Sequence, residues 1–204
     1  EHRAATFLNI TLGRYLLARA YLRQNASRYD QVLLSDSRDV IFQRDPFQDL
    51  PHPLLTGLES GLVRDQPSNC SWLQTLYGGD PAFPMDQVLA QKVICSGVTL
   101  GTTDAVLDYL DRMTVEFMER LPALVHTPYL DQGAHIGLIR TGRLPGIHLT
   151  PNGEPWIATL GTSDLSEFTL SPSGSLLTLQ GEPVRIVHQH DRHPHLLQQL
   201  AALR

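Results

Sequence analysis

Residues 29–47, YDQVLLSDSRDVIFQRDPF, carry an apolar run directly into a cluster of carboxylates and one arginine. Residues 32–34 predict a strand that is buried on both faces, and residues 36–39 follow at its carboxyl end, where open α/β sheets place their ligands. Residues 40–42 are again apolar and predict a second anchored segment. The pattern therefore predicts an acidic turn fixed between two buried segments.

This acidic turn has two interpretations. Mg²⁺ and Mn²⁺ prefer hard oxygen ligands and commonly bind a substrate phosphate as well, so Asp36 and Asp39 are candidate metal ligands. Alternatively, the turn is a local structure in which Arg38 pairs with Asp36 or Asp39, because Asp and Ser favour turns for their own hydrogen bonds. The turn by itself leaves both interpretations open.

The composition is that of an ordinary folded domain. A chain of 204 residues with 42% apolar and 18% charged residues is long enough for one domain with its own core. The net charge of -5 and the lack of Lys/Arg runs argue against binding of nucleic acid. No apolar stretch is long enough to span a bilayer, and no signal peptide is visible. Cys70 and Cys95 are expected to be reduced thiols, which favours a cytoplasmic location.

Apolar periodicity predicts helices and strands in alternation, and therefore an α/β domain. We expect helices over 6–24, 104–121 and 131–139, further strands over 93–101 and 184–187, and a short helix from Pro194. Residues 59–80 lack periodicity and are expected to be mostly loop or a short helix. From residue 149 to 187, Pro-Asn-Gly and Ser-Pro-Ser-Gly turns predict β-hairpins.

The helix over 104–121 has the strongest pattern in the chain. Thr103 is expected to cap it, and seven apolar residues are expected on its buried side. These residues are Val106, Leu107, Leu110, Met113, Val115, Phe117 and Met118.

The strand over 93–101 contains glycines, at Gly97 and Gly101. Glycine inside a strand often marks the close approach of a ligand or of another backbone. Tryptophan offers a different signal, since Trp72 and Trp156 could each stack on a sugar ring or belong to the core.

A second polar cluster, HQHDRHPH at residues 188–195, follows the last predicted strand. It is either a polar surface tail or a group of ligands at a strand end. His188, His190 and His193 have the histidine spacing of the HxHxDH zinc motif of metallo-hydrolases. Arg192 occupies the position of the aspartate in that motif, which argues against it.

In combination, four segments resemble a GT-A glycosyltransferase that uses a nucleotide sugar, with the glycogenin-like retaining enzymes as the nearest parallel. DSRD at 36–39 resembles the DxD metal motif with one extra residue, and CSGV at 95–98 with Gly101 resembles the segment that lines the donor-sugar pocket. YLDQ at 129–132 resembles the acidic DQ element beside the sugar. VHQHDR at 187–192 resembles the late histidine segment that completes the metal site.

The resemblance implies a fold and a metal site. The fold is a GT-A-like, Rossmann-like mixed sheet flanked by helices over residues 1–204, with C-terminal β-hairpins. Only 35 residues precede Asp36, so the usual N-terminal nucleotide-binding unit is expected to be missing or altered. Mn²⁺ or Mg²⁺ would be bound by Asp39 and His188, with Asp36 as a further ligand or as the partner of the ribose. The metal hypothesis predicts that the ligand atoms of Asp39 and His188 lie within about 5 Å of each other.

The remaining site residues follow from the same resemblance. Donor binding is assigned to Asp36, Arg38, Ser96, Gly97 and Arg192, the arginines facing the diphosphate. Asp131 and Gln132 are assigned to catalysis near the sugar or the acceptor hydroxyl. An alternative for Asp131 is a structural role as the N-cap of the helix that starts at Gln132.

The resemblance implies a metal-dependent glycosyltransferase, and we expect it to be a hexosyltransferase. It would move a sugar from a nucleoside-diphosphate sugar to a carbohydrate, protein or small-molecule acceptor. Two alternatives from other classes are a non-catalytic carbohydrate- or partner-binding domain of the same fold and a metal-dependent phosphohydrolase.

Overall fold

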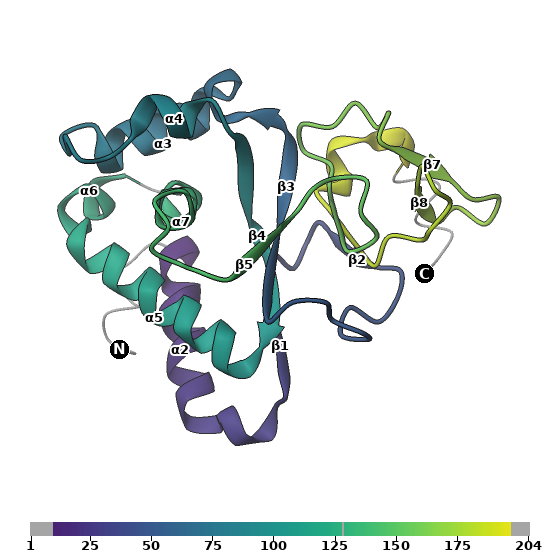
Figure 1. Ribbon diagram of the computed structural model, residues 1–204, viewed down its shortest axis with the longest axis horizontal. Coiled ribbons are helices and arrows are strands. Elements are labelled where there is room, and N and C mark those ends of the chain that lie inside the picture. The colour runs from purple at the N-terminus through teal and green to yellow at the C-terminus, as the bar shows by residue number, and fades with distance from the viewer. Residues whose placement is uncertain (1–9, 128, 197–204) are drawn as a thin grey trace.

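The computed structural model describes residues 10–127 and 129–196, and its centre is a four-stranded mixed sheet (Figure 1). The strand order is β1-β4-β3-β5. β4 is antiparallel to both β1 and β3, whereas β5 is parallel to β3. The strands are β1 (Gln31–Ser35), β3 (Leu54–Leu62), β4 (Lys92–Thr102) and β5 (Ile147–Thr150). The predicted α/β class and mixed sheet are confirmed.

Helices cover one face of this sheet (Figure 1). The described helices are α2 (Ile10–Asn25), α3 (Pro67–Tyr77), α4 (Met85–Leu89), α5 (Thr103–Glu119), α6 (Leu121–His126) and α7 (Asp131–Arg140), with the short turns η1 (Ala26–Arg28), η2 (Val63–Asp65) and η3 (His190–Arg192). The largest core cluster lies at this face, where Val93 and Ile94 of β4 meet Tyr109 and Met113 of α5. None of the helices among the described residues is long and apolar enough to cross a membrane.

Small sheets and the short turn η3 lie on the other face (Figure 1). A three-stranded sheet has the order β2-β9-β6, and β7 and β8 form a separate pair. The strands are β2 (Val40–Phe42), β6 (Ile157–Thr159), β7 (Phe168–Leu170), β8 (Leu176–Thr178) and β9 (Ile186–His188). Leu55, Val98 and Leu100 of the central sheet pack here against Ile157 and Ile186. The expected helical flanks are therefore present on one face only.

The C-terminal turns behave differently from each other. The Ser171–Gly174 turn joins β7 to β8 in a hairpin, as predicted, and Gly174 N donates to Ser171 O at 2.9 Å. The Pro151–Gly153 turn instead leads from β5 in the central sheet to β6 in the second sheet. Residues 6–9 of the first predicted helix, and the C-terminal helix beyond Leu196, lie outside the described residues.

The prediction for residues 59–80 is correct for a short helix, the eleven-residue α3, but it misses the end of a central strand, β3. The strand β3 has the sequence LLTGLESGL, whose glycines and glutamate hide its pattern. Gly57 lies so close to the second sheet that a Cβ there would come within 2.7 Å of Thr159 and 2.9 Å of Ile157. Packing between the two sheets thus requires the residue type that weakens the strand signal.

Two details of α5 also differ from the prediction. Thr102, and not Thr103, caps the helix, since its side chain accepts from Ala105 N at 3.4 Å. Thr103 instead donates its hydroxyl to the Tyr29 carbonyl. Val115 and Met118 are 56% and 63% exposed, because they lie off the stripe that faces the sheet.

Candidate metal centre

Three candidate ligands from distant parts of the sequence meet where the two sheets join. Asp36 follows β1, and its backbone N–H donates to the Gly97 carbonyl of β4 at 2.8 Å. Asp39 precedes β2 and His188 ends β9, and these strands pair so that Gln189 N donates to Asp39 O at 2.8 Å. Strand pairing in the two sheets therefore places all three side chains.

The side chains of Asp36, Asp39 and His188 form the metal-ligand cluster. His188 Nε2 lies 3.3 Å from Asp36 Oδ2 and 3.9 Å from Asp39 Oδ2. The three ligand atoms all lie within 4.8 Å of one another. Ligands on opposite sides of one Mg²⁺ lie about 4.2 Å apart, so a small side-chain adjustment would fit a cation. The predicted proximity of Asp39 and His188 is confirmed, and two carboxylates with one imidazole form a set that suits a divalent metal.

β4 forms a socket for the His188 ring. Cys95 Sγ lies 3.5 Å from His188 Nδ1, and Gly97 lies against the Cε1–Nε2 edge of the ring. A Cβ on Gly97 would overlap this edge as well as the Asp36 carboxylate. Gly97 therefore does mark a close approach, but of a histidine side chain. With Nδ1 facing Cys95, Nε2 faces the carboxylates.

Charge is concentrated at this junction. Burial alone would lower the pKa of His188, but Cys95, Asp36 and Asp39 raise it to about 10. Burial likewise opposes ionisation of Asp36, but His188 and Arg14 hold the pKa of this carboxyl below its usual range. Binding of a metal to the cluster would therefore displace a proton from His188.

Arg14 of α2 connects the cluster to the predicted catalytic element, and the sequence analysis missed it. Its guanidinium contacts Asp36, and its Nη2 lies 2.9 Å from Asp131 Oδ2 and 3.3 Å from the Ser96 carbonyl. Burial alone would lower the pKa of Arg14, but Tyr15, Asp131 and Asp36 raise it, so the side chain stays charged. α2 also contains Arg19 and Arg23, so the local sequence gave no signal that distinguished Arg14.

Asp131 and Gln132 lie in the first turn of α7. The N-cap of α7 is Leu130, so the interpretation of Asp131 as the N-cap is wrong. Burial raises the pKa of Asp131 while Arg14 opposes this shift. The Gln132 amide donates to Asn69 Oδ1 of α3 at 2.9 Å. Arg14 therefore connects Asp131 to Asp36 of the metal-ligand cluster, whereas Gln132 contacts α3.

One cavity of about 620 Å³ brings most of the predicted site residues together. Its lining includes Asp36, Ser96, Gly97, Asp131, Gln132, His188 and Arg192. Arg38 does not line it, because its side chain is 83% exposed and its Nη2 lies 3.5 Å from Asp191 Oδ2. Arg38 therefore pairs with neither Asp36 nor Asp39, and its side chain lies outside the cavity.

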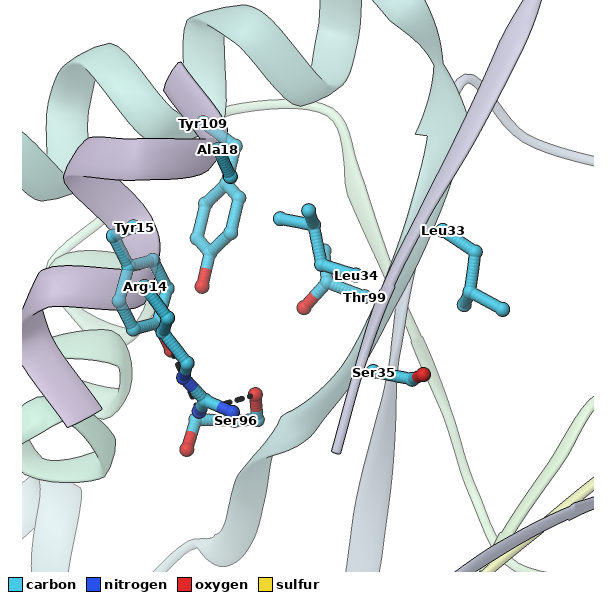
Figure 2. Close-up of a pocket in the computed structure, with 9 residues that line it drawn as sticks. All are labelled: Arg14, Tyr15, Ala18, Leu33, Leu34, Ser35, Ser96, Thr99 and Tyr109. Carbon is cyan, nitrogen blue, oxygen red and sulfur yellow. Dashed lines mark hydrogen bonds between the residues drawn. The ribbon is translucent and has the colours of Figure 1, made fainter. Parts of the chain in front are cut away.

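A second cavity, of about 280 Å³, lies between α2, β1, β4 and α5 (Figure 2). Its walls are largely apolar, with Leu33 and Leu34 among them, and Arg14 and Ser96 border both cavities. In Figure 2, Arg14 reaches the Tyr15 hydroxyl, 3.3 Å away, as well as the Ser96 carbonyl. Burial raises the pKa of Tyr15 to about 12, so neutral groups anchor Arg14 from this side.

The zinc-motif histidines do not come together as a metal site. His193 Nε2 contacts the Leu160 carbonyl at 2.8 Å, and the metal-ligand cluster is the one group of potential metal ligands found among the described residues.

Glu59 of β3 is only 4% exposed, and burial raises its pKa against the opposing influence of Thr162, His188 and Gln132. The sequence analysis missed Glu59 because it treated this part of β3 as a loop.

Comparison with known proteins assigns no family to the chain. No protein-family model matches it, and no curated protein matches it in sequence. The functional interpretation therefore depends on the geometry of the site and on the resemblance of its motifs.

Proposed function

We propose that this chain is a metal-dependent glycosyltransferase that uses a nucleoside-diphosphate sugar as donor. The observation that carries the proposal is the convergence of Asp36, Asp39 and His188, with ligand atoms within 4.8 Å, beside a cavity of about 620 Å³ that Asp131 also lines. A cavity of this volume is in the range of small-molecule sites. Mn²⁺ or Mg²⁺ is the proposed cofactor.

The metal-ligand cluster and Arg192 would bind the diphosphate end of the donor. When bound, the divalent cation supplies positive charge beside the departing β-phosphate. Arg192 lines the same cavity, and its planar guanidinium offers paired donors that match phosphate oxygens. Ser96 and Gly97 would line the donor pocket, since both border this cavity.

Asp131 is the proposed catalytic carboxylate. Arg14 fixes its Oδ2 at 2.9 Å from the guanidinium and links it to Asp36, so the carboxylate has a defined orientation next to the donor end. In this position it would orient the acceptor hydroxyl or stabilise positive charge at the sugar carbon. Gln132, adjacent in the cavity, would hydrogen-bond the sugar.

A turnover assay tests the proposal. Purified protein is incubated with UDP-, GDP- and ADP-hexoses in Mn²⁺, in Mg²⁺ and in EDTA, and release of nucleoside diphosphate is measured. Release that requires the cation supports the transferase. Saturable donor binding without release would instead support the non-catalytic binding domain, and cation-dependent cleavage of simple phosphate esters alone would support the phosphohydrolase.

The proposal includes a cytoplasmic location. Both cysteines, Cys70 and Cys95, carry free thiols, which agrees with a reducing compartment.

A further inference from the structure

Tyr129 is an exposed aromatic residue in a strained backbone conformation. Its side chain is 59% exposed, and its φ of 64° lies in the left-handed region. This region is unfavourable for a bulky residue, and such strain clusters at ligand sites. Tyr129 lines the cavity of about 620 Å³, and so does the half-buried Trp72 of α3.

A chain of contacts separates these two aromatic residues from the metal-ligand cluster. Asp36 contacts Arg14, which contacts Asp131 at the start of α7. The next residue, Gln132, bonds Asn69 of α3, and Trp72 follows one helical turn later. Trp72 and the cluster therefore lie at opposite ends of this series, with Asp131 and Gln132 between them.

The order of residues along this series matches the order in which the parts of two bound substrates are expected to lie. The diphosphate belongs beside the metal-ligand cluster, and the reacting sugar carbon belongs beside Asp131. The second substrate must then enter from the side away from the cluster. Trp72 lies at that end of the series, and Tyr129, two residues before Asp131, lines the same cavity.

The chemistry of this side fits a carbohydrate. A sugar ring carries C–H groups on one face, which pack against the electron-rich face of an aromatic ring, and hydroxyls at its edge. Asp131 and Gln132 supply a carboxylate and an amide for those hydroxyls, and both line the same cavity. Aromatic surface with a few polar groups beside it is the usual composition of a small-ligand site.

Trp156 provides the contrast within the same chain. Both tryptophans are half-buried and pack against core clusters, but the Trp156 ring is covered by Arg185, whose guanidinium lies 4.2 Å from its centroid. Trp156 does not line the cavity of about 620 Å³. Of the two tryptophans considered for sugar stacking, only Trp72 is placed for it.

We propose that Trp72 and Tyr129 form an aromatic platform that binds the acceptor, and that the acceptor is a carbohydrate. This inference rests on the proposed function, because it assigns the second substrate of the same site. Donor turnover in a protein that responds to no disaccharide would instead indicate an acceptor other than a carbohydrate.

The test uses tryptophan fluorescence, because the chain contains two tryptophans. Trp156→Phe leaves Trp72 as the one tryptophan, and the protein is titrated with maltose, cellobiose, lactose and mannobiose in Mn²⁺ and UDP. We expect a saturable change in emission with at least one disaccharide. The reciprocal variant Trp72→Phe retains Trp156 and is expected to show no change. Tyr129→Ala in the Trp156→Phe background is expected to raise the dissociation constant at least tenfold.

The outcomes separate the platform from the transferase. Equal disaccharide affinity with and without Tyr129→Ala, or no response to any disaccharide in a protein that binds UDP, would overturn the platform. Saturation-transfer NMR of the unmodified protein with the same disaccharides repeats the measurement without any substitution. Disaccharide binding without donor turnover would support the aromatic platform and contradict the transferase. Donor turnover without disaccharide binding would support the transferase and contradict the platform.

Discussion

His188 and His135 are both buried, but the regions around them give them opposite properties. His188, 1% exposed, lies at the junction of the two sheets beside two carboxylates, and its pKa is raised to about 10. His135, 0% exposed, lies in the helical layer with its Nδ1 2.8 Å from the Tyr109 hydroxyl. Burial lowers the pKa of His135 to about 3, and Arg14 adds to this shift.

The difference shows that burial does not make a histidine a ligand. Burial disfavours the charged form in both places, and at His188 the neighbouring Cys95 and the two carboxylates reverse the outcome. The sheet junction thus concentrates charge that a substrate or cation can use. Among the described residues, the helical surroundings of His135 supply no carboxylate to oppose the effect of burial, so this residue contributes packing as a neutral ring. The two regions should respond differently to substitution, activity changing in one and stability in the other.

Removing one carboxylate from the junction should have the largest effect. We expect Asp39→Asn to lower the cation-dependent release of nucleoside diphosphate by about a thousandfold, because the cation loses a charged ligand. The fold should persist, since Asn has nearly the same size and the backbone carbonyl of residue 39 still accepts from Gln189 N. Donor hydrolysis with and without Mn²⁺ is the measurement, with the exposed Asp86→Asn as control. Equal rates in Asp39→Asn and the parent would contradict a metal-assisted leaving group.

Asp131 tests whether the charged region extends beyond the metal-ligand cluster. Asp131→Ser and Asp131→Asn should each lower turnover by about a hundredfold, because neither side chain supplies a negative charge at the reacting sugar. The melting temperature should change little, because Asp131 is not the N-cap of α7 and Arg14 keeps its contact with Asp36. Paired thermal melts and donor-turnover assays measure both quantities. Full activity in both variants would leave Asp131 with a structural role.

Cys95 tests the socket that orients His188. We expect Cys95→Ala to weaken Mn²⁺ binding about tenfold, since groups that orient a ligating histidine typically contribute this much to metal affinity. Cys95→Ser should recover part of the loss because a hydroxyl can still bond Nδ1. Isothermal titration with Mn²⁺ is the measurement, and Cys70→Ala, at the other free thiol, is the control. Unchanged affinity in Cys95→Ala would show that His188 needs no partner at Nδ1.

The sequence predicted the elements whose patterns are local. The apolar runs of β1, β2 and β4 and the stripe of α5 need no information from the rest of the chain. The metal-ligand cluster was also predicted, because Asp36, Asp39 and His188 each stand at the end of an apolar segment.

The elements that the sequence did not reveal depend on contacts between distant segments. β3 is a strand because it lies between β4 and β5, and Gly57 is there because β6 approaches it. Arg14 gains its role only when α2 packs beside β1 and α7, which brings Asp36 and Asp131 to one guanidinium. Local periodicity contains neither fact.

The smallest expected effect belongs to the helical layer and is a change in stability with pH. The pKa of His135 is about 3 in the folded protein and about 6.5 when unfolded, so between these values the unfolded chain binds the proton more tightly. Its contribution to stability is complete above about pH 6.5 and is lost as the pH falls, by up to about 1.4 kcal/mol for each pH unit. Urea denaturation at pH 7, 6 and 5.5 measures this slope, above the range where most carboxylates titrate.

Substitution assigns the slope to this residue. His135→Gln cannot gain a proton and keeps an acceptor for the Tyr109 hydroxyl, so we expect it to remove most of the loss between pH 6.5 and 5.5. The exposed His52→Gln should leave the slope as it is in the parent. If His135→Gln and the parent lose stability equally over this range, burial does not lower the pKa of His135. The proposed difference in pKa between His135 and His188 would then be contradicted.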